Sequence, residues 1–251
     1  MSNPQALLLE RRGHGVLGRE EACMAALASA RGVPVQFTSA KQMERGKVAI
    51  KPGMVAIGSV RFVKHSLRQL GKTLPEHTPY PDSLHSMLHR EVQKVPALRE
   101  VRKMLTKGQR MFVKPADGWK RFTGFVADDP RDMRFNGASS SMAVWISDPV
   151  EFVSEWRAYV AGGHLLDVRF ADHGGDKSVA VDRGVIEEAV RRLAATGAAP
   201  AGYVMDFGVL QDCGRTALIE VNDGFSFGAY DGVAPEVYWQ VSVGRWAELV
   251  Q

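Results

Sequence analysis

The chain has 251 residues, of which 45% are hydrophobic and 24% are charged, a mixture typical of a folded protein with a sizeable core. Its 32 basic and 28 acidic residues give a net charge of +4, which suits a nucleotide as well as a nucleic acid and requires neither. Cys23 and Cys213 lie far apart without metal-ligand spacing and give no support to a disulfide framework. No apolar run approaches the roughly 18 residues of a membrane span, so we expect a soluble cytoplasmic protein with no membrane partner.

Residues 1–95 alternate short strands and helices, which predicts an N-terminal α/β domain. The expected strands are "ALLLE", "VPVQF" and "GMVAIGS", and the expected helices are "GREEACMAALASARG" and "SVRFVKHSLRQLG". A proline-rich connection, "KTLPEHTPYPDSLH", follows them and is unsuited to a helix. We expect Asp82 to cap a helix over 83–94, and a second helix over 97–105 after Pro96.

Residues 96–251 form a second predicted domain, rich in short strands separated by turn residues. The expected strands are "RMFVKP", "RFTGFV", "SMAVWIS", "SEWRAYVAGG", "HLLDVRFA", "AGYVMDFGVL" and "RTALIEVND". Two helices are expected among and after them, over 181–197 and 235–250, since both segments carry apolar residues at helical spacing.

Two lysines lie near one predicted hairpin in "MFVKPADGWKRFTGFV". Lys114 ends an apolar strand, and Lys120 follows the turn. Two such cations can converge on phosphate oxygens. The alternative is a pair of ordinary surface lysines, which base rates favour for any lone pair.

Three oxygen-bearing side chains lie on the last two predicted strands, in "VMDFGV" and "LIEVND". Glu220 and Asn222 are two residues apart and therefore share a face, and Asp206 lies on the neighbouring strand. Such hard ligands suit Mg²⁺, which needs only one or two carboxylates beside water and substrate phosphates. The alternative is a set of polar residues at ordinary strand ends, but Glu220 is embedded in an apolar strand and needs a partner.

The strand "SEWRAYV" places Glu155, Arg157 and Tyr159 on one face, and Arg169 on the partner strand could join it. The two arginines could form a clamp for phosphate or an oxyanion. A cross-strand ion pair of small energetic value is the alternative.

The histidines give weaker signals. His85 and His89 are four apart on the helix expected over 83–94 and could chelate a metal, but a third ligand is missing and a solvated face is the favoured interpretation. His173 lies in a glycine loop that either closes over a ligand or is a plain loop. The chain also lacks a Walker loop, which disfavours P-loop enzymes.

The ordered set "FVKP", "EWRAYV", "MDFGV" and "LIEVNDG" resembles the ATP-grasp superfamily over about residues 100–232. The segments "GSVRFVKHSLRQLG" and "PYPDSLHSMLHR" resemble in particular the clade distinguished by one arginine and two lysines, found in phages and bacteria. The resemblance implies two α+β subdomains that sandwich ATP, preceded by a small α/β domain. The turn "ADGWKRFTG" is shorter than the long glycine-rich lid of many members. This difference affects the expected position of Lys120 more than that of Lys114.

The resemblance also implies roles for individual residues. Lys114 and Lys120 would contact the ATP phosphates, the segment "AVWISDPVEF" would bind adenine, and Glu151 would contact ribose. Metal ligation would fall to Asp206, Glu220 and Asn222, which would hold one or two Mg²⁺ ions. Stabilisation of the transferred phosphoryl group would fall to Arg157 and Arg169. Ser226 and Tyr230, in the loop after the last strand, could touch the acceptor.

These expectations predict an ATP- and Mg²⁺-dependent carboxylate-amine ligase that forms an acyl phosphate and ADP on a peptide, protein or amino-acid substrate. The alternatives are a kinase of the same fold that phosphorylates a hydroxyl, and a nucleotide- or nucleic-acid-binding module without turnover. The last ranks low because the aromatic and basic residues are not arranged as a stacking platform, so we expect no nucleic-acid partner.

Overall fold

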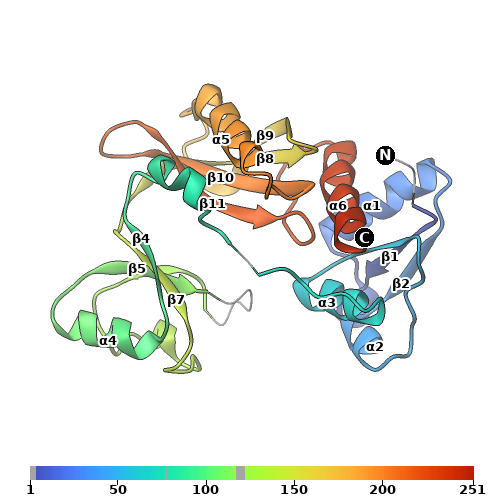
Figure 1. The fold of residues 1–251 in the computed structure, drawn as a ribbon, viewed down its shortest axis with the longest axis horizontal. Helices are drawn as coiled ribbons and strands as arrows, with labels where there is room; N and C mark the ends of the chain where they lie inside the picture. The colour runs from blue at the N-terminus through green and yellow to red at the C-terminus, as the bar shows by residue number, and fades with distance from the viewer. Residues whose placement is uncertain (1–3, 77, 117–121) are drawn as a thin grey trace.

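The computed structural model describes residues 4–76, 78–116 and 122–251. The described residues form three sheets, each with its own helices (Figure 1). One lobe holds β1 to β3, a second holds β4 to β7, and a third, between them in the view, holds β8 to β11. The arrangement confirms the mixed α/β and α+β architecture expected from the sequence.

The N-terminal sheet is parallel and has the strand order β2-β1-β3. Its strands are β1 (Ala6–Glu10), β2 (Val35–Thr38) and β3 (Met54–Ile57). The helices of this lobe are α1 (Arg19–Ala30), α2 (Ala40–Glu44) and α3 (Val60–Gln69), with a short 3-10 helix at Gly13–Gly15. The helix α6 (Pro235–Leu249), the last helix of the chain, packs against α1 and β3, so the N-terminal lobe combines the first strands with the last helix (Figure 1).

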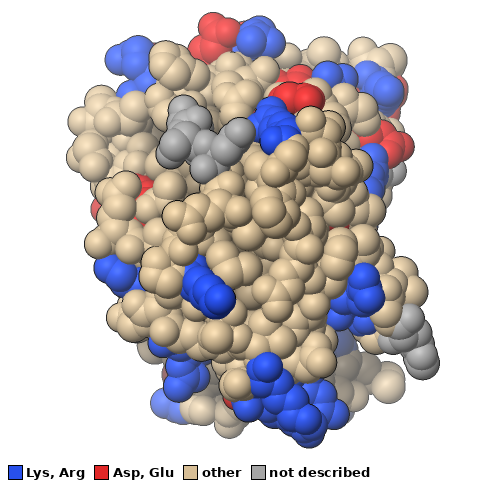
Figure 2. All heavy atoms as spheres, turned by 90° about the vertical axis from the view of Figure 1, so that its right-hand side faces the viewer, with Lys and Arg blue, Asp and Glu red and all other residues tan. Residues whose placement is uncertain are grey.

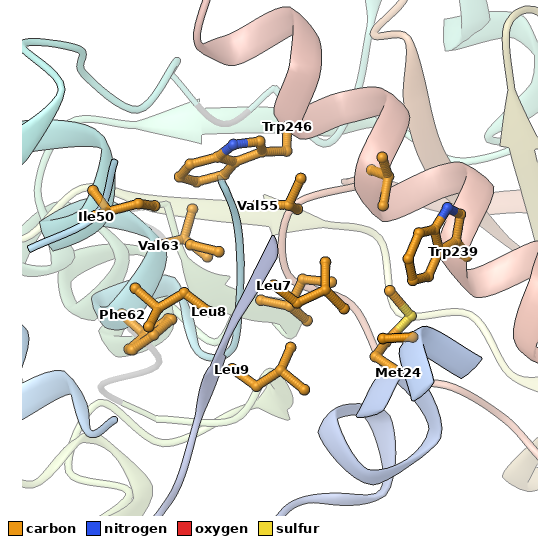
Figure 3. Packing of buried hydrophobic residues seen from close by; sticks show 14 of the residues in the cluster. Leu7, Leu8, Leu9, Met24, Ile50, Val55, Phe62, Val63, Trp239 and Trp246 are labelled. Carbon is orange, nitrogen blue, oxygen red and sulfur yellow. The ribbon is translucent and has the colours of Figure 1, made fainter. Parts of the chain in front are cut away.

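Both faces of this sheet are buried, as is usual for parallel sheets covered by helices. Leu7, Leu8 and Leu9 have no exposed surface. Leu8 points towards Phe62 of α3, whereas Leu7 and Leu9 point to the side of α1 and α6, as Figure 3 shows. The alternation follows from the two-residue period of a strand. It explains why "ALLLE" is continuously apolar.

The second lobe has an antiparallel sheet with the strand order β4-β7-β5-β6. Its strands are β4 (Val92–Val95), β5 (Met111–Pro115), β6 (Phe125–Ala127) and β7 (Val144–Ser147). The helix α4 (Leu98–Thr106) covers the sheet, and a 3-10 helix lies at Met133–Phe135. Leu98, Val101 and Leu105 line the buried face of α4, which is the face expected from their helical spacing.

The third lobe has an antiparallel sheet with the strand order β11-β10-β8-β9. Its strands are β8 (Phe152–Ala161), β9 (His164–Gly175), β10 (Gly202–Leu210) and β11 (Thr216–Asp223). The helix α5 (Arg183–Ala195) packs on one face with Ile186, Ala189 and Leu193. Gly162 and Gly163 form the turn between β8 and β9, both with positive φ, a conformation that glycine adopts without strain.

The helix expected over 83–94 is wrong. The structure has a 3-10 helix at Asp82–Met87 and then β4. His89 takes a left-handed backbone conformation with φ 50°, which a continuing helix does not allow. Val95 precedes Pro96, and a residue before proline favours extended backbone. Pairing of β4 with β7 therefore outweighs the helical spacing of the segment.

The domain boundary expected at residue 95 stays a prediction, and two packing features bear on it. β4 belongs to the sheet of the second lobe, although it precedes the boundary. Trp239 and Trp246 of α6 lie in the core of the N-terminal lobe, although they follow it. A division of the chain at residue 95 therefore separates β4 and α6 from the lobes in which they pack.

Among the residues that the structure describes, no helix is both long and apolar enough to cross a membrane.

Candidate functional site

A cavity of about 1000 Å³ lies where the three lobes meet, at the upper end of the size range of ligand pockets. Its lining includes residues before and at the start of α3, residues of β5 and β6, and side chains of β8 and β11. Ser147, Asp148 and Val150, between the second and third lobes, also line it. Every lobe therefore contributes residues to one cavity.

Four charged side chains form a row across the third sheet. The strand register places Glu220 opposite Asp206, Asp206 opposite Arg157, and Arg157 opposite Arg169. Residues opposite one another in neighbouring strands point to the same face of a sheet. The sequence placed these residues on strands by alternation alone, and the pairing brings the first three together beside the cavity.

The centre of this row is a buried ion pair. Arg157 donates from Nε to Oδ1 of Asp206 at 2.7 Å and from Nη2 to Oδ2 at 2.8 Å. The side chains are only 10% and 13% exposed. Burial alone would lower the pKa of Arg157, but the Asp206 carboxylate outweighs it and the pKa is raised. Burial also raises the pKa of Asp206 against the opposing charge of Arg157.

Asn222 and Lys114 extend the ion pair into a network. Asn222 Nδ2 donates to Asp206 Oδ2 at 3.1 Å and to Glu220 Oε1 at 3.0 Å, so all three predicted metal ligands are in contact. Lys114 reaches across from β5 and forms an ion pair with Glu220. Burial by itself would lower the pKa of Lys114, but the charge of Glu220 raises it overall.

Tyr80 and Arg90 also belong to this network, and sequence reasoning missed both. Lys114 Nζ lies 4.5 Å from the centre of the Tyr80 ring, a cation–π distance. The Pro79 carbonyl accepts a hydrogen bond from the Val221 backbone N–H at 2.9 Å, which holds Tyr80 beside β11. No local pattern could have indicated this contact, because it joins residues far apart in the chain.

Arg90 fixes the backbone directly before Glu220. It donates from Nη1 to the Leu218 carbonyl at 2.9 Å and from Nη2 to the Ile219 carbonyl at 2.8 Å, and it lines the cavity. Burial lowers the pKa of Arg90, although an arginine remains charged at neutral pH. The only sequence signal was an arginine within a segment that we expected to be helical.

Glu155 lines the cavity beside the row and forms no hydrogen bond or ion pair with another described side chain. Burial, then the charges of Asp206 and Glu220, raise its pKa. Ser154 pairs with Gly175 and Trp156 with Phe170, so Glu155 alone faces residues 171–174 of β9. Bulges of this kind redirect side chains beside functional sites. The cross-strand ion pair considered from the sequence is present, but it joins Arg157 to Asp206 and is buried rather than exposed.

The loop that follows β11 closes one wall of the cavity. Gly228 O accepts from Arg157 Nη1 at 3.2 Å, and Tyr230 N donates to the Tyr159 hydroxyl at 3.0 Å. The Arg157 guanidinium lies 4.3 Å from the centre of the Tyr230 ring, and Ser226 also lines the cavity. Glu20 of α1 accepts from the Ala229 backbone N–H at 3.1 Å, so the N-terminal lobe holds the loop in place.

The remaining predicted residues lie apart from this network or outside the described residues. Arg169 completes the row but turns to Asp167, with Nε to Oδ2 at 2.7 Å, and it does not line the cavity. Glu151 is exposed and also absent from the lining, to which Asp148 contributes instead. Lys120 lies outside the described residues.

The histidine hypotheses gain no support. His85 and His89 do not share an α-helix, and in the described part of the chain no group of three or more His, Cys, Asp or Glu side chains could hold a metal. His173 is exposed and contacts Tyr230 edge-on, with ring centres 6.4 Å apart.

The sequence matches a family model over residues 88–241, described as the ATP-grasp domain of family 2 in the clade named for its arginine and two lysines. The chain belongs to this ATP-grasp family. The matched region contains the second and third sheets and nearly all of the network described above, with only Tyr80 preceding it. The resemblance deduced from the sequence, including the clade, is thereby confirmed.

Several solved structures share the fold over nearly the whole chain. A RimK-domain ATP-grasp protein from Sphaerobacter thermophilus is 13% identical, with a TM-score of 0.60, over 96% of this chain and 99% of that one. D-cycloserine synthetase DcsG is 15% identical, with a TM-score of 0.59, over 95% and 99%. The ATP-grasp ligase PsnB, solved with a minimal precursor, is 12% identical, with a TM-score of 0.54, over 96% and 99%. No curated protein sequence matches the chain.

The side chains present fit the ATP and Mg²⁺ that ATP-grasp enzymes use. Asp206, Glu220 and Asn222 supply carboxylate and amide oxygens in one cluster, the ligand type that Mg²⁺ prefers. Lys114 and Arg157 supply positive charge at the same place. In this structure Glu220 pairs with Lys114 and Asp206 with Arg157. The phosphates of a nucleotide would bind the same two cations, and a metal ion would bind the same two carboxylates.

Proposed function

We propose that the protein is an ATP- and Mg²⁺-dependent ligase that joins a carboxylate to an amine through an acyl phosphate and releases ADP. The observation that supports this most strongly is the convergence of Lys114 from one sheet with Arg157, Asp206 and Glu220 from another at a single cavity. Phosphoryl transfer needs mainly positioning and positive charge, and this network supplies both.

In this proposal the network binds and orients the triphosphate. Lys114 exchanges Glu220 for a phosphate oxygen, and Arg157 faces the transferred phosphoryl group through the Nη1 that now contacts Gly228. Asp206, Glu220 and Asn222 would hold Mg²⁺, which when bound neutralises phosphate charge and acts as a Lewis acid. Arg90 keeps Glu220 in place through the β11 backbone.

The remaining site residues have separate proposed tasks. The segment around Ser147–Val150 lines the cavity between two lobes and would receive the adenine. Glu151 and Lys120 remain proposed ribose and phosphate contacts, and Arg169 remains a proposed second cation for the acyl phosphate. Ser226 and Tyr230 would face the acceptor, since their loop forms a wall of the cavity.

The proposed substrate is a peptide, protein or amino acid. PsnB, which shares the fold, was solved with a minimal precursor, and the cavity of about 1000 Å³ extends beyond the charged network to the N-terminal lobe. In the proposed reaction the substrates themselves attack, so no side-chain nucleophile is required.

The test measures ADP formation from MgATP with hydroxylamine as the amine, across a panel of amino acids and glutamate-containing peptides. Carboxylate-dependent ADP and a hydroxamate product are expected, with oxygen-18 passing from a labelled carboxylate to phosphate. Lys114→Met and Glu220→Gln should lose this activity, whereas the exposed controls Lys107→Met and Glu187→Gln should retain it.

Several outcomes would contradict the proposal. AMP formation would indicate adenylation, and a stable phosphorylated alcohol would indicate a kinase. Full activity in folded Lys114→Met or Glu220→Gln protein would show that the network does not bind the triphosphate.

A further inference from the structure

The charge of the chain is divided unevenly between its lobes. Residues 1–76 contain 12 Lys and Arg but only 5 Asp and Glu, a net charge of +7. The whole chain carries +4, so the other 175 residues carry a net charge of −3. A charge asymmetry of this size indicates a partner of opposite charge at the N-terminal lobe.

The positive charge gathers on α2, α3 and the connections that follow α2. Lys41, Arg45, Lys47, Lys51 and Arg68 are all exposed, and we call these five residues the α2–α3 basic face. None of the five forms an ion pair or a side-chain hydrogen bond with another described residue. Figure 2 shows Lys and Arg at the lower end of this lobe, where α2 lies in Figure 1, with little acidic surface between them.

The segment that carries the α2–α3 basic face has no further acidic side chain to neutralise it. Glu44 is the only Asp or Glu between residues 41 and 72, and it pairs with Arg61. The five cations therefore face solvent with their charge uncompensated. Such a cluster costs self-repulsion, so it is more easily understood as a binding surface than as a device for stability.

The face is held rigid by hydrogen bonds. Gln69 Nε2 donates to the Met43 and Val48 carbonyls at 3.3 and 3.1 Å, and Gln69 Oε1 accepts from Ile50 N at 3.0 Å. These bonds tie the end of α3 to the segment that carries Lys47 and Lys51. A fixed arrangement of charges loses less entropy on binding than a flexible one.

The helix α3 links this face to the cavity. Ser59 and Val60, at the start of α3, line the cavity, and Arg68 lies in its last turn. The eight residue steps from Val60 to Arg68 span about 12 Å at 1.5 Å per residue. An extended peptide covers that distance with about four residues. A chain bound at the basic face can thus place a side chain about four residues away in the cavity.

We propose that the α2–α3 basic face docks an acidic segment of a polypeptide substrate and so presents a nearby carboxylate to the cavity. The identity of the reacting carboxylate rests on the proposed ligase function, whereas the docking itself does not. An acidic peptide fits better than a nucleic acid, because every Phe, Trp and Tyr that the structure describes is at least partly buried. The face therefore offers no exposed aromatic ring on which bases could stack.

The test measures fluorescence anisotropy of a labelled oligoglutamate peptide with the full chain and no ATP. Saturable binding that weakens with added salt is expected, and an oligoglutamine peptide and a single-stranded oligothymidylate should bind more weakly. Arg45→Glu/Lys47→Glu should lower the affinity roughly tenfold or more, as expected when exposed ion pairs are lost and replaced by repulsion. The matched control Lys107→Glu/Arg110→Glu changes the net charge equally on another lobe and should leave the affinity nearly unchanged.

The outcomes separate this proposal from the ligase function. Lys114→Met should still bind the peptide, because Lys114 lies in the cavity and not on the basic face. Absence of saturable peptide binding, tighter binding of the oligothymidylate, or equal losses in the two double variants would each overturn the docking proposal. Peptide binding without any carboxylate-dependent ADP formation would instead refute the ligase proposal alone.

Discussion

The buried Arg157–Asp206 pair gives the sharpest test of how the site is built. Arg157→Met removes the cation but leaves a carboxylate that is only 13% exposed. Breaking a buried pair in this way costs about 3–5 kcal/mol. Since about 1 kcal/mol lowers the melting temperature of a chain of this size by about 2–4 °C, the variant should melt roughly 6–20 °C below the parent.

A second substitution isolates the energetic contribution of the ion pair itself. In Arg157→Met/Asp206→Leu the uncompensated carboxylate is gone, and replacing a buried ion pair with apolar side chains is often neutral. The double variant should therefore be more stable than Arg157→Met alone, although neither should turn over ATP. Arg183→Met is the matched control: Arg183 pairs with Glu187 on the surface of α5 and is 65% exposed, so its loss should cost about 0.3–0.5 kcal/mol.

Thermal unfolding followed by circular dichroism provides the measurement, on Arg157→Met, Asp206→Leu, the double variant and the control. The reasoning requires an interaction between the two substitutions well above the scatter of about 0.5 kcal/mol expected for independent sites. Losses of the two single variants that simply add, or an Arg157→Met variant as stable as the Arg183→Met control, would refute it.

Three further predictions concern other parts of the molecule. Glu155 has a raised pKa in the folded chain, so ionised Glu155 lowers the stability of the fold once the pH exceeds the ordinary carboxyl pKa. Glu155→Gln should therefore raise the melting temperature at neutral pH. Near about pH 4 the melting temperatures of the variant and the parent should converge. Trp246 is 2% exposed and donates to the β3 backbone at 2.8 Å, so Trp246→Ala should cost about 3–5 kcal/mol in urea unfolding, against less than about 0.5 kcal/mol for the exposed Val16→Ala. Gly175 and Gly163 both have positive φ, but of the two only Gly175 would place a Cβ 2.3 Å from a backbone oxygen. Gly163→Ala should therefore cost about 1–2 kcal/mol, and Gly175→Ala distinctly more. Equal melting temperatures of the two variants would contradict the tight bulge at Gly175.

Local patterns predicted most of the fold because most of its elements satisfy their own periodicity. "ALLLE" and "VIEEAVRRLAA" each contain the signal of their element, and both form it. The failure over 83–94 arises where long-range contacts decide the backbone: β4 forms because it pairs with β7, and His89 takes its unusual φ where the chain leaves a 3-10 helix. The five-residue helix α2 carries its capping box of Ser39 and Gln42, a signal that was present in the sequence but not used.

In the site, too, local patterns were predictive and long-range contacts were not. Alternation on single strands was enough to place Asp206, Glu220 and Asn222 together, because side chains that are two apart or directly paired share a face. Alternation could not reveal which partner each charge takes. Arg157 pairs with Asp206 across strands rather than with the neighbouring Glu155, and Tyr80 reaches the site only through the hydrogen bond at Pro79.

The three lobes have their own apolar cores, and the charged network lies between two of them. Buried residues of β1, α3 and α6 form one cluster, those of β5 and α4 a second, and those of β8, β10 and α5 a third. Lys114 belongs to the second lobe and Glu220 to the third, so their ion pair joins two lobes whose main cores are distinct, although Val92 and Trp145 of the second lobe also pack against the core of the third. Separate cores allow relative motion unless their interface is large and apolar. A ligand that takes Lys114 from Glu220 would therefore change the contact between two lobes as well as the charges in the cavity.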